Sequence, residues 1–155
     1  MTFGYLRHEY EKFSLKIPLS IRLPKKTSNI LMVGKSGSGK SFSARFYIWN
    51  MLHTGESNVY ISDYKGGEEY EAFEGSSSYA SGNEAIDMIH NFYSLFTEIR
   101  NRRIKLKHHI TLFIEEYLGV LTYAETQSKK LKTDIMAKVG ELLAVSRGLN
   151  IGIIL

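Results

Sequence analysis

Apolar residues fall along the chain in two alternating patterns. Short continuous runs, typical of strands buried on both faces, lie at 29–33, 58–62, 110–114 and 151–155. Stretches with apolar residues three and four positions apart, typical of amphipathic helices, lie at 41–52, 84–107 and 134–147. Strands that alternate with helices in this way predict an α/β fold with a mainly parallel sheet.

Details of the helices and loops follow from individual residues. The apolar members of the first predicted helix include Phe42, Phe46 and Trp49. Gly148 follows the last predicted helix and fits its C′ position. Residues 65–83 are rich in Gly, Ser, Glu and Tyr, which predicts a segment that is mostly loop.

The N-terminal residues carry a different pattern. Apolar and polar side chains alternate over 13–23, which predicts a half-buried strand or hairpin arm. Pro18 lacks a backbone donor, so this strand lies at a sheet edge or is interrupted there. We divide the chain into an N-terminal β segment with its linker, 1–28, and a core, 29–155. Because the chain stops inside an apolar run, we expect a fragment that is truncated after the fourth core strand.

Composition narrows the class of protein. A length of 155 residues fits one domain, and no cysteine is present to form disulfides or thiolate metal sites. No run reaches the ~20 apolar residues of a membrane helix, and the first residues lack a signal sequence. We therefore expect a cytoplasmic protein that meets membranes only through partners or missing regions. The net charge of +4 permits contact with nucleic acid but does not require it.

A glycine-rich loop joins the first predicted strand to the first predicted helix. Its sequence, Gly34-x-x-x-x-Gly39-Lys40-Ser41, is the Walker A pattern in its required context. Glycines let backbone N–H groups point at phosphate oxygens, and the helix N-terminus adds partial positive charge. We predict that Lys40 holds the β- and γ-phosphates with a catalytic role, and that the Ser41 hydroxyl ligates Mg²⁺. The predicted ATP-binding residues are Gly34, Lys35, Ser36, Gly37, Ser38, Gly39, Lys40, Ser41 and Phe42.

Two carboxylates, Glu115 and Glu116, end the third predicted strand. P-loop ATPases need one acid for the metal and often a second to orient the attacking water. We assign Glu115 to Mg²⁺ and Glu116 to catalysis, as general base or water-positioning group. The usual first acid is Asp, and the longer Glu115 side chain makes a water-mediated metal contact and weak hydrolysis real alternatives. A charged strand end that faces solvent is the structural alternative.

Adenine is favoured as the base by elimination. An ABC-type ATPase would carry an LSGGQ-like signature before the second acidic site, and none is present. A GTPase would carry an Asn-Lys-x-Asp guanine reader, which is also missing from the sequence.

Four stretches together resemble the FtsK/SpoIIIE family of DNA-pumping ATPases, part of the HerA–FtsK group. They are the Walker A passage 30–41, Asp63-Tyr64-Lys65-Gly66, Phe113-Ile114-Glu115-Glu116 and the passage 145–155 around Arg147. The chain departs from the family at two of them, because Tyr64 replaces proline and Glu115 replaces aspartate. The family's sensor glutamine would follow Leu155.

The resemblance implies a RecA-like/ASCE P-loop NTPase, a three-layer sandwich around a mainly parallel sheet. In it the strand that ends at Leu155 would lie between the Walker A strand and the Glu115 strand. The resemblance further implies an ATPase that uses ATP and Mg²⁺, forms a homo-oligomer, typically a hexameric ring, and drives double-stranded DNA through its pore. Smaller relatives act as coupling ATPases on conjugative elements and plasmids.

Other polar residues stay open between two interpretations. Asp63 and Lys65 lie near the nucleotide or shape the loop after the second strand. Arg147 contacts a neighbouring subunit's phosphates or, as we prefer, is a cation favoured by the helix dipole.

The basic runs are more typical of solvated helix ends than of phosphate contacts. Their members are Arg102, Arg103, Lys105, Lys107, His108, His109, Lys129, Lys130 and Lys132. The adjacent histidines lack the spacing of a helical metal site, so we expect no zinc.

Three functions remain in view. The first is an ATP-driven DNA translocase motor. The second is a nucleotide-binding module that does not hydrolyse ATP and serves in assembly or regulation. The third is a secretion-type ATPase of the same group, whose turnover would not respond to DNA.

Overall fold

The computed structural model describes the chain except for residues 1, 6, 17, 21–28, 36 and 54–56. A parallel sheet of four strands forms its centre, in the order β4-β3-β5-β6. The strands are β3 (Ser57–Asp63), β4 (Tyr79–Ser81), β5 (His109–Glu115) and β6 (Ile151–Ile154). The predictions at 58–62, 110–114 and 151–155 are thus confirmed, because these apolar runs can be buried on both faces of a parallel sheet. The short strand β4, within the predicted loop 65–83, was not expected.

The segment before the phosphate loop extends this sheet without forming a regular strand. Ile30 and β6 pair in parallel, with Ile30 N donating to Ile153 O at 2.9 Å and Leu155 N to Ile30 O at 3.0 Å. β6 therefore lies between this segment and β5, as the resemblance implies. The prediction of a fully buried strand at 29–33 is wrong, since Leu31 is 71% and Val33 84% exposed. Among the described residues, no further strand covers their outer side.

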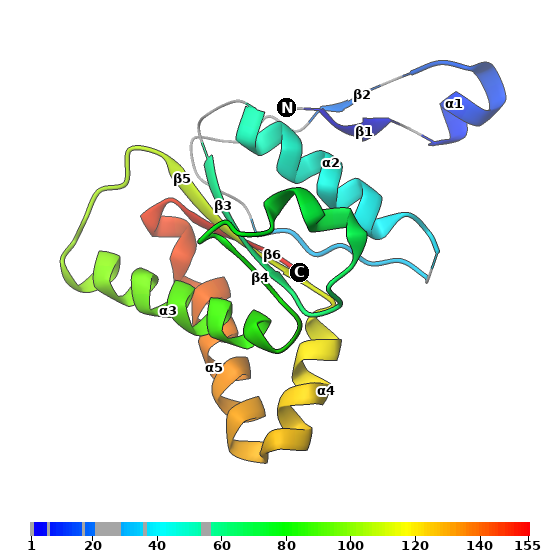
Figure 1. Ribbon diagram of the computed structural model, residues 1–155. Coiled ribbons are helices and arrows are strands. Elements are labelled where there is room, and N and C mark those ends of the chain that lie inside the picture. Colours follow the sequence, from blue (N-terminus) through cyan, green and yellow to red (C-terminus); the bar gives the residue numbers. More distant parts are fainter. Residues whose placement is uncertain (1, 6, 17, 21–28, 36, 54–56) are drawn as a thin grey trace.

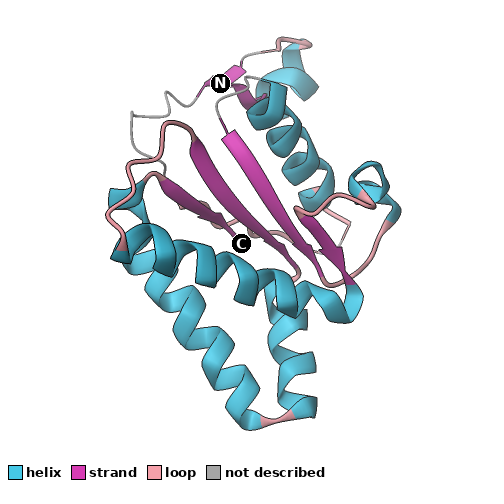
Figure 2. Cartoon of the chain, turned by 60° about the vertical axis from the view of Figure 1, so that its left-hand side comes forward, coloured by secondary structure: helices cyan, strands magenta, loops and turns pink. Residues whose placement is uncertain are grey.

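Helices cover both faces of the sheet, giving three layers (Figure 2). One face carries α2 (Lys40–His53) and the 3-10 helix η1 (Glu68–Phe73) over a core that includes Ile48, Ile61 and Phe113. The other face carries α3 (Ala85–Asn101), α4 (Tyr117–Gln127) and α5 (Lys129–Val145). The short turns η2 (Gly82–Glu84) and η3 (Ser146–Leu149) lead into α3 and β6.

Three helix boundaries differ from the sequence-based expectation. α3 ends at Asn101 rather than near residue 107, because Arg103 takes a left-handed conformation with φ 52°. α5 begins at Lys129 rather than at 134, because the Ser128 hydroxyl caps it by accepting from Leu131 N at 3.1 Å. Gly148 lies within η3, and Asn150 is the left-handed residue that follows this turn, with φ 66°.

The buried face of α2 also differs. It consists of Ala44, Tyr47, Ile48 and Met51. Phe42, Phe46 and Trp49, the apolar members noted in the sequence, are 65%, 36% and 63% exposed on the other side of the helix.

The N-terminal residues form a second, two-stranded sheet. β1 (Thr2–Tyr5) pairs antiparallel with β2 (Pro18–Ser20), and α1 (Arg7–Phe13) lies between them in sequence. The predicted strand over 13–23 is wrong at its start, because Phe13 ends a helix and both Phe13 and Leu15 are about half exposed. Its last residues and the predicted loop 24–28 lie outside the described residues, and the proposed boundary near residue 28 stays a prediction. Among the described helices, none has the length and apolar character needed to cross a bilayer.

Candidate nucleotide-binding site

The glycine-rich loop follows the segment that pairs with β6 and leads directly into α2 (Figure 1). Gly37 and Gly39 have φ of 74° and 83°, a backbone conformation that other residues adopt at a cost. A Cβ on Gly34 would lie 2.5 Å from Ser38 Oγ, so a side chain there would displace the Ser38 hydroxyl. The loop thus has the tight turns that a phosphate-binding backbone requires. The predicted contact Ser36 lies outside the described residues.

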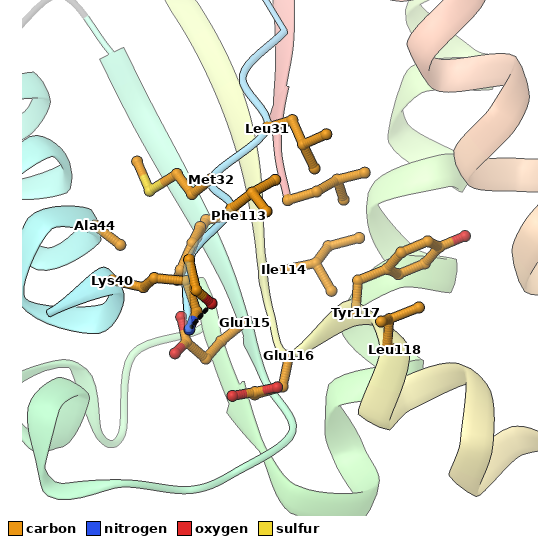
Figure 3. A pocket seen from close by; sticks show the side chains of 13 residues that line it. Leu31, Met32, Lys40, Ala44, Phe113, Ile114, Glu115, Glu116, Tyr117 and Leu118 are labelled. Carbon is orange, nitrogen blue, oxygen red and sulfur yellow. Dashed lines mark hydrogen bonds between the residues drawn. The ribbon is translucent and has the colours of Figure 1, made fainter. Parts of the chain in front are cut away.

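Lys40 folds back over this loop. Its ammonium group donates to Gly34 O at 2.8 Å, the bond dashed in Figure 3, and to Lys35 O at 3.1 Å. Since α2 begins at Lys40, the partial positive charge of the helix N-terminus adds to the charge of the ammonium. The loop therefore concentrates positive charge beside glycine backbone that is free to turn.

The hydroxyl of Ser41 meets the carboxylate of Glu115 across the site. Ser41 Oγ donates to Glu115 Oε1 at 2.7 Å, which joins the first turn of α2 to the end of β5. Glu115 is only 8% exposed. Its second oxygen, Oε2, accepts from Tyr70 Oη of η1 at 3.2 Å. Both carboxylate oxygens are thereby fixed in position.

Tyr70 is held as a neutral hydrogen-bond donor. Burial, reinforced by the negative charge of Glu115 and by their hydrogen bond, raises the pKa of Tyr70 well above its ordinary value. Its ring also packs against Phe113, with the centroids 5.6 Å apart. A residue of the segment predicted as loop thus orients the carboxylate that ends β5.

The Ser41 and Glu115 oxygens fit a magnesium site. Mg²⁺ binds oxygen at 2.0–2.1 Å in octahedral geometry, so two adjacent ligand oxygens lie about 3 Å apart. The observed 2.7 Å between Ser41 Oγ and Glu115 Oε1 is close to that spacing. The Glu115 carboxylate thus lies within hydrogen-bond distance of the serine hydroxyl, and these are the two oxygens that could hold a magnesium ion.

Glu116, the second carboxylate, has a strained backbone. Its φ of 55° and ψ of 49° are left-handed, which is uncommon for a residue other than glycine or asparagine. It connects β5 to α4, and its carbonyl accepts from Val120 N at 3.0 Å. The side chain is exposed and points toward the same side as Glu115, whereas Tyr117 and Leu118 point away (Figure 3). Among the described residues, no hydrogen bond or ion pair engages this carboxylate, so the turn presents it beside the phosphate loop. Backbone strain of this kind is often found at functional sites.

Two hollows meet at this point. The larger, of about 740 Å³, lies between the phosphate loop and Lys65, and its volume suits a ligand of nucleotide size. The second, of about 410 Å³, extends from Lys40 along apolar residues that include Leu31, Met32 and Leu118 (Figure 3). Glu116 lines both hollows.

Asp63 and Lys65 have different roles. Asp63 is fully buried; its carboxylate accepts from Gly66 N at 3.0 Å and from Tyr79 Oη at 3.1 Å. It therefore shapes the loop after β3. Lys65 is 3.9 Å from Glu69 and lines the larger hollow, so it joins the site.

Sequence reasoning missed two residues of this site, Arg45 and Tyr70. Arg45 lines the larger hollow, and its guanidinium lies 5.4 Å from the ring centre of Phe42. Its position four residues after Ser41 on a predicted helix was a usable signal, because residues at that spacing share a helix face. No local pattern marks Tyr70, whose contact with Glu115 spans 45 residues.

The remaining basic residues lie away from the phosphate loop. Arg147 and the run that starts at Arg102 are found at the opposite end of the sheet, before β6 and β5. Lys129, Lys130 and Lys132 lie in the first turn of α5, where Lys132 pairs with Glu125 at 2.7 Å.

No protein-family profile matches the chain, and no curated protein does. Among solved structures, the chain is similar to the pCW3 conjugation coupling protein TcpA, in its monomer form with ATPγS. The TM-score is 0.65 at 24% sequence identity, and the match covers 100% of this chain and 47% of that chain. The chain thus spans about half the length of that structure. At this identity the likeness shows the fold, and it confirms the predicted α/β class with a parallel sheet of RecA-like type.

Proposed function

We propose that the chain binds Mg·ATP at the phosphate loop and is the motor domain of an ATPase that moves double-stranded DNA. The Ser41–Glu115 pair carries this proposal, since its 2.7 Å spacing beside Lys40 gives the oxygens and the charge that a metal–triphosphate complex needs. The similar structure supports it, because that conjugation coupling protein was solved with ATPγS. From the FtsK/SpoIIIE resemblance we take double-stranded DNA as the partner and a homo-oligomeric ring as the assembly. Contact with a membrane would be made through other proteins.

The residues of the chain have separate roles in the proposed reaction. The backbone of 34–39 and the ammonium of Lys40 bind the phosphates. To do so, the ammonium gives up its hydrogen bonds to the carbonyls of Gly34 and Lys35 and donates to phosphate oxygens instead. Ser41 and Glu115 hold Mg²⁺, which when bound neutralises charge on the β- and γ-phosphate oxygens. Glu116 is free to orient a water for in-line attack and to accept its proton.

Cations at the rim of the site add to the phosphate-binding charge. Lys65 and Arg45 line the same hollow as the loop. Neither is held by a short ion pair in the described part of the chain, so both can turn toward a triphosphate.

A second function is favoured by one observation. Both Glu115 oxygens accept hydrogen bonds, one from Ser41 and one from Tyr70. If these bonds outlast metal binding, the site holds nucleotide without turnover, and the chain is an assembly or regulatory module. A secretion-type ATPase differs from both in having turnover that duplex DNA does not change.

The binding experiment can use the single tryptophan as its reporter. Trp49 lies on α2 eight residues after Ser41, about 12 Å along the helix. Energy transfer from Trp49 to a methylanthraniloyl ATP analogue therefore measures occupancy, with calorimetry on unlabelled Mg·ATP as a second readout. Lys40→Ala should weaken binding about 100-fold, which corresponds to the loss of about 3 kcal/mol of charged hydrogen bonding. The exposed Lys129→Ala is the matched control and should leave the affinity unchanged.

Hydrolysis with and without duplex DNA then separates the functions. DNA-stimulated turnover that disappears in Lys40→Ala supports the motor. Binding without turnover supports the module, and turnover insensitive to DNA supports a secretion-type ATPase. Equal nucleotide affinity in wild type and Lys40→Ala contradicts all three.

A further inference from the structure

A basic pocket lies at the end of the sheet opposite to the phosphate loop. It forms between the loop that follows α3 and the turn η3 that precedes β6, and its volume is about 440 Å³. Its cations are Arg100, Arg103, Lys105 and Arg147, and no acidic residue of the described chain lines it. Arg147 and the basic run, which are separate in the sequence, are thus brought together.

The sheet creates this pocket by aligning the starts of two strands. β5 and β6 are neighbours, with Ile110 opposite Ile151 and Ile110 N donating to Asn150 O at 3.3 Å. The segments that enter these strands therefore lie side by side (Figure 1). Seven residues of β5 separate the pocket from Glu115, about 20 Å at strand spacing. The pocket is therefore separate from the nucleotide site of the same chain.

Left-handed backbone shapes both walls of the pocket. Arg103 has φ 52° and Asn150 has φ 66°. The Arg103 turn ends α3 early and directs the following basic residues along the loop instead of continuing the helix. For an arginine this conformation costs about 1–2 kcal/mol. Among the described residues of the basic run, Arg103 alone adopts it.

The charge in this region is not balanced within the chain. Arg100 is paired with Glu141, and Arg102 with Glu98 at 3.0 Å. Arg103, Lys105, Lys107 and Arg147 have no acidic partner among the residues that the structure describes. Three of these four cations follow one another within five residues, and the turn η3 brings Arg147 beside them. Such a cluster of like charge is the electrostatic footprint of an anionic partner.

We propose that the pocket and its loop bind backbone phosphates of double-stranded DNA, an inference that rests on the DNA partner of the proposed function. An extended polyanion fits better than a single phosphate group for two reasons. The unpaired cations continue beyond the pocket to the exposed Lys107, and exposed lysine and arginine bind DNA chiefly through the counterions that the DNA releases. Each cation that contacts a phosphate therefore makes the affinity for DNA more dependent on the salt concentration.

The test is the salt dependence of DNA binding, measured by the fluorescence anisotropy of a labelled duplex with EDTA and without nucleotide. Four phosphate contacts give a slope of about −3.6 in log K against log salt, or about 150-fold weaker binding when salt rises fourfold. Lys105→Gln and Arg147→Gln should each reduce the slope by about 0.9, so that the same rise in salt weakens binding only about 40-fold.

The control is Lys130→Gln, which removes one unit of charge from the exposed first turn of α5 and should keep the wild-type slope. A control that lowers the slope as much as the pocket variants, or pocket variants with the wild-type slope, overturns the proposal. So does an Arg147→Gln variant that loses only nucleotide turnover, because Arg147 would then serve a neighbouring nucleotide.

Nucleotide is left out so that the two proposals fail independently. Lys40→Ala should bind the duplex with the wild-type slope even where it has lost ATP. A protein that binds ATP through Lys40 but shows no affinity for the duplex overturns the pocket and leaves the nucleotide site standing.

Discussion

The turn at Glu116 stores backbone strain, and the amount can be measured. A non-glycine residue in the left-handed region costs about 1–2 kcal/mol, and Glu116 has φ 55° and ψ 49°. Glycine removes this cost but adds about 0.5–1 kcal/mol of chain entropy to the unfolded state. Because the Glu116 side chain is exposed, its removal loses little packing. Glu116→Gly should therefore stabilise the fold by up to about 1 kcal/mol, which raises Tm by about 2–4 °C.

Thermal unfolding followed by circular dichroism measures this effect against two comparisons. Glu116→Gln keeps a side chain at the strained position and should melt with the wild type. Asn150→Gly changes another left-handed residue, φ 66°, but asparagine adopts this region readily, so its shift should be much smaller. The reasoning about strain is refuted if Glu116→Gly melts no higher than Glu116→Gln.

The same pair of variants separates strain from chemistry. Both lack the carboxylate, so both should keep Mg·ATP binding and lose turnover by about 10²–10⁴-fold, the usual contribution of a general base. If Glu116→Gln turns over at the wild-type rate, Glu116 does not position the attacking water. If only the glycine variant is inactive, the backbone of the turn matters and the carboxylate does not.

Two further predictions concern packing and pH. In Gly119→Ala the new Cβ would lie 2.9 Å from the Tyr64 ring, so denaturant unfolding should show a loss of about 1–3 kcal/mol, abolished in a Tyr64→Ala background. Gly140→Ala, with no neighbouring atom within 4 Å, should instead stabilise α5 by about 1 kcal/mol, and a loss there would contradict the packing argument. The pH prediction concerns His90, whose pKa is lowered by burial and by the charge of Lys138. Because the unfolded chain binds this proton more readily than the folded chain, the free energy of unfolding should fall as pH drops below 6.5. His90→Gln should flatten that part of the pH profile, and an unchanged profile would exclude His90 as its source.

Much of the sheet could be predicted from the sequence, because strands buried on both faces need continuous apolar runs. The runs that became β3, β5 and β6 have that pattern, and the Walker A glycines mark the one loop whose backbone must turn at positive φ. The carboxylates Glu115 and Glu116 were identified because two acids end an apolar strand, as expected for the metal and water sites of a P-loop ATPase. Whether they hold metal and water as predicted is left to the experiments above.

What could not be predicted depends on long-range packing. α2 is apolar on two sides, so the sequence does not tell which of Phe46 or Tyr47 faces the sheet. α4 buries only Val120 and Ala124, too few residues for a clear helical period. Tyr70 becomes part of the site only because η1 folds over β5.

The strained residue Glu116 lies at the base of a projecting pair of helices. α4 starts directly after Glu116, and with α5 it projects beyond the sheet as a hairpin (Figures 1 and 2). Its 11 residues extend about 16 Å, so a tilt of about 10° at the base would displace the far end by about 3 Å. Any change in the Glu116 dihedral angles would therefore appear as a larger displacement at the tip of the hairpin than at its base.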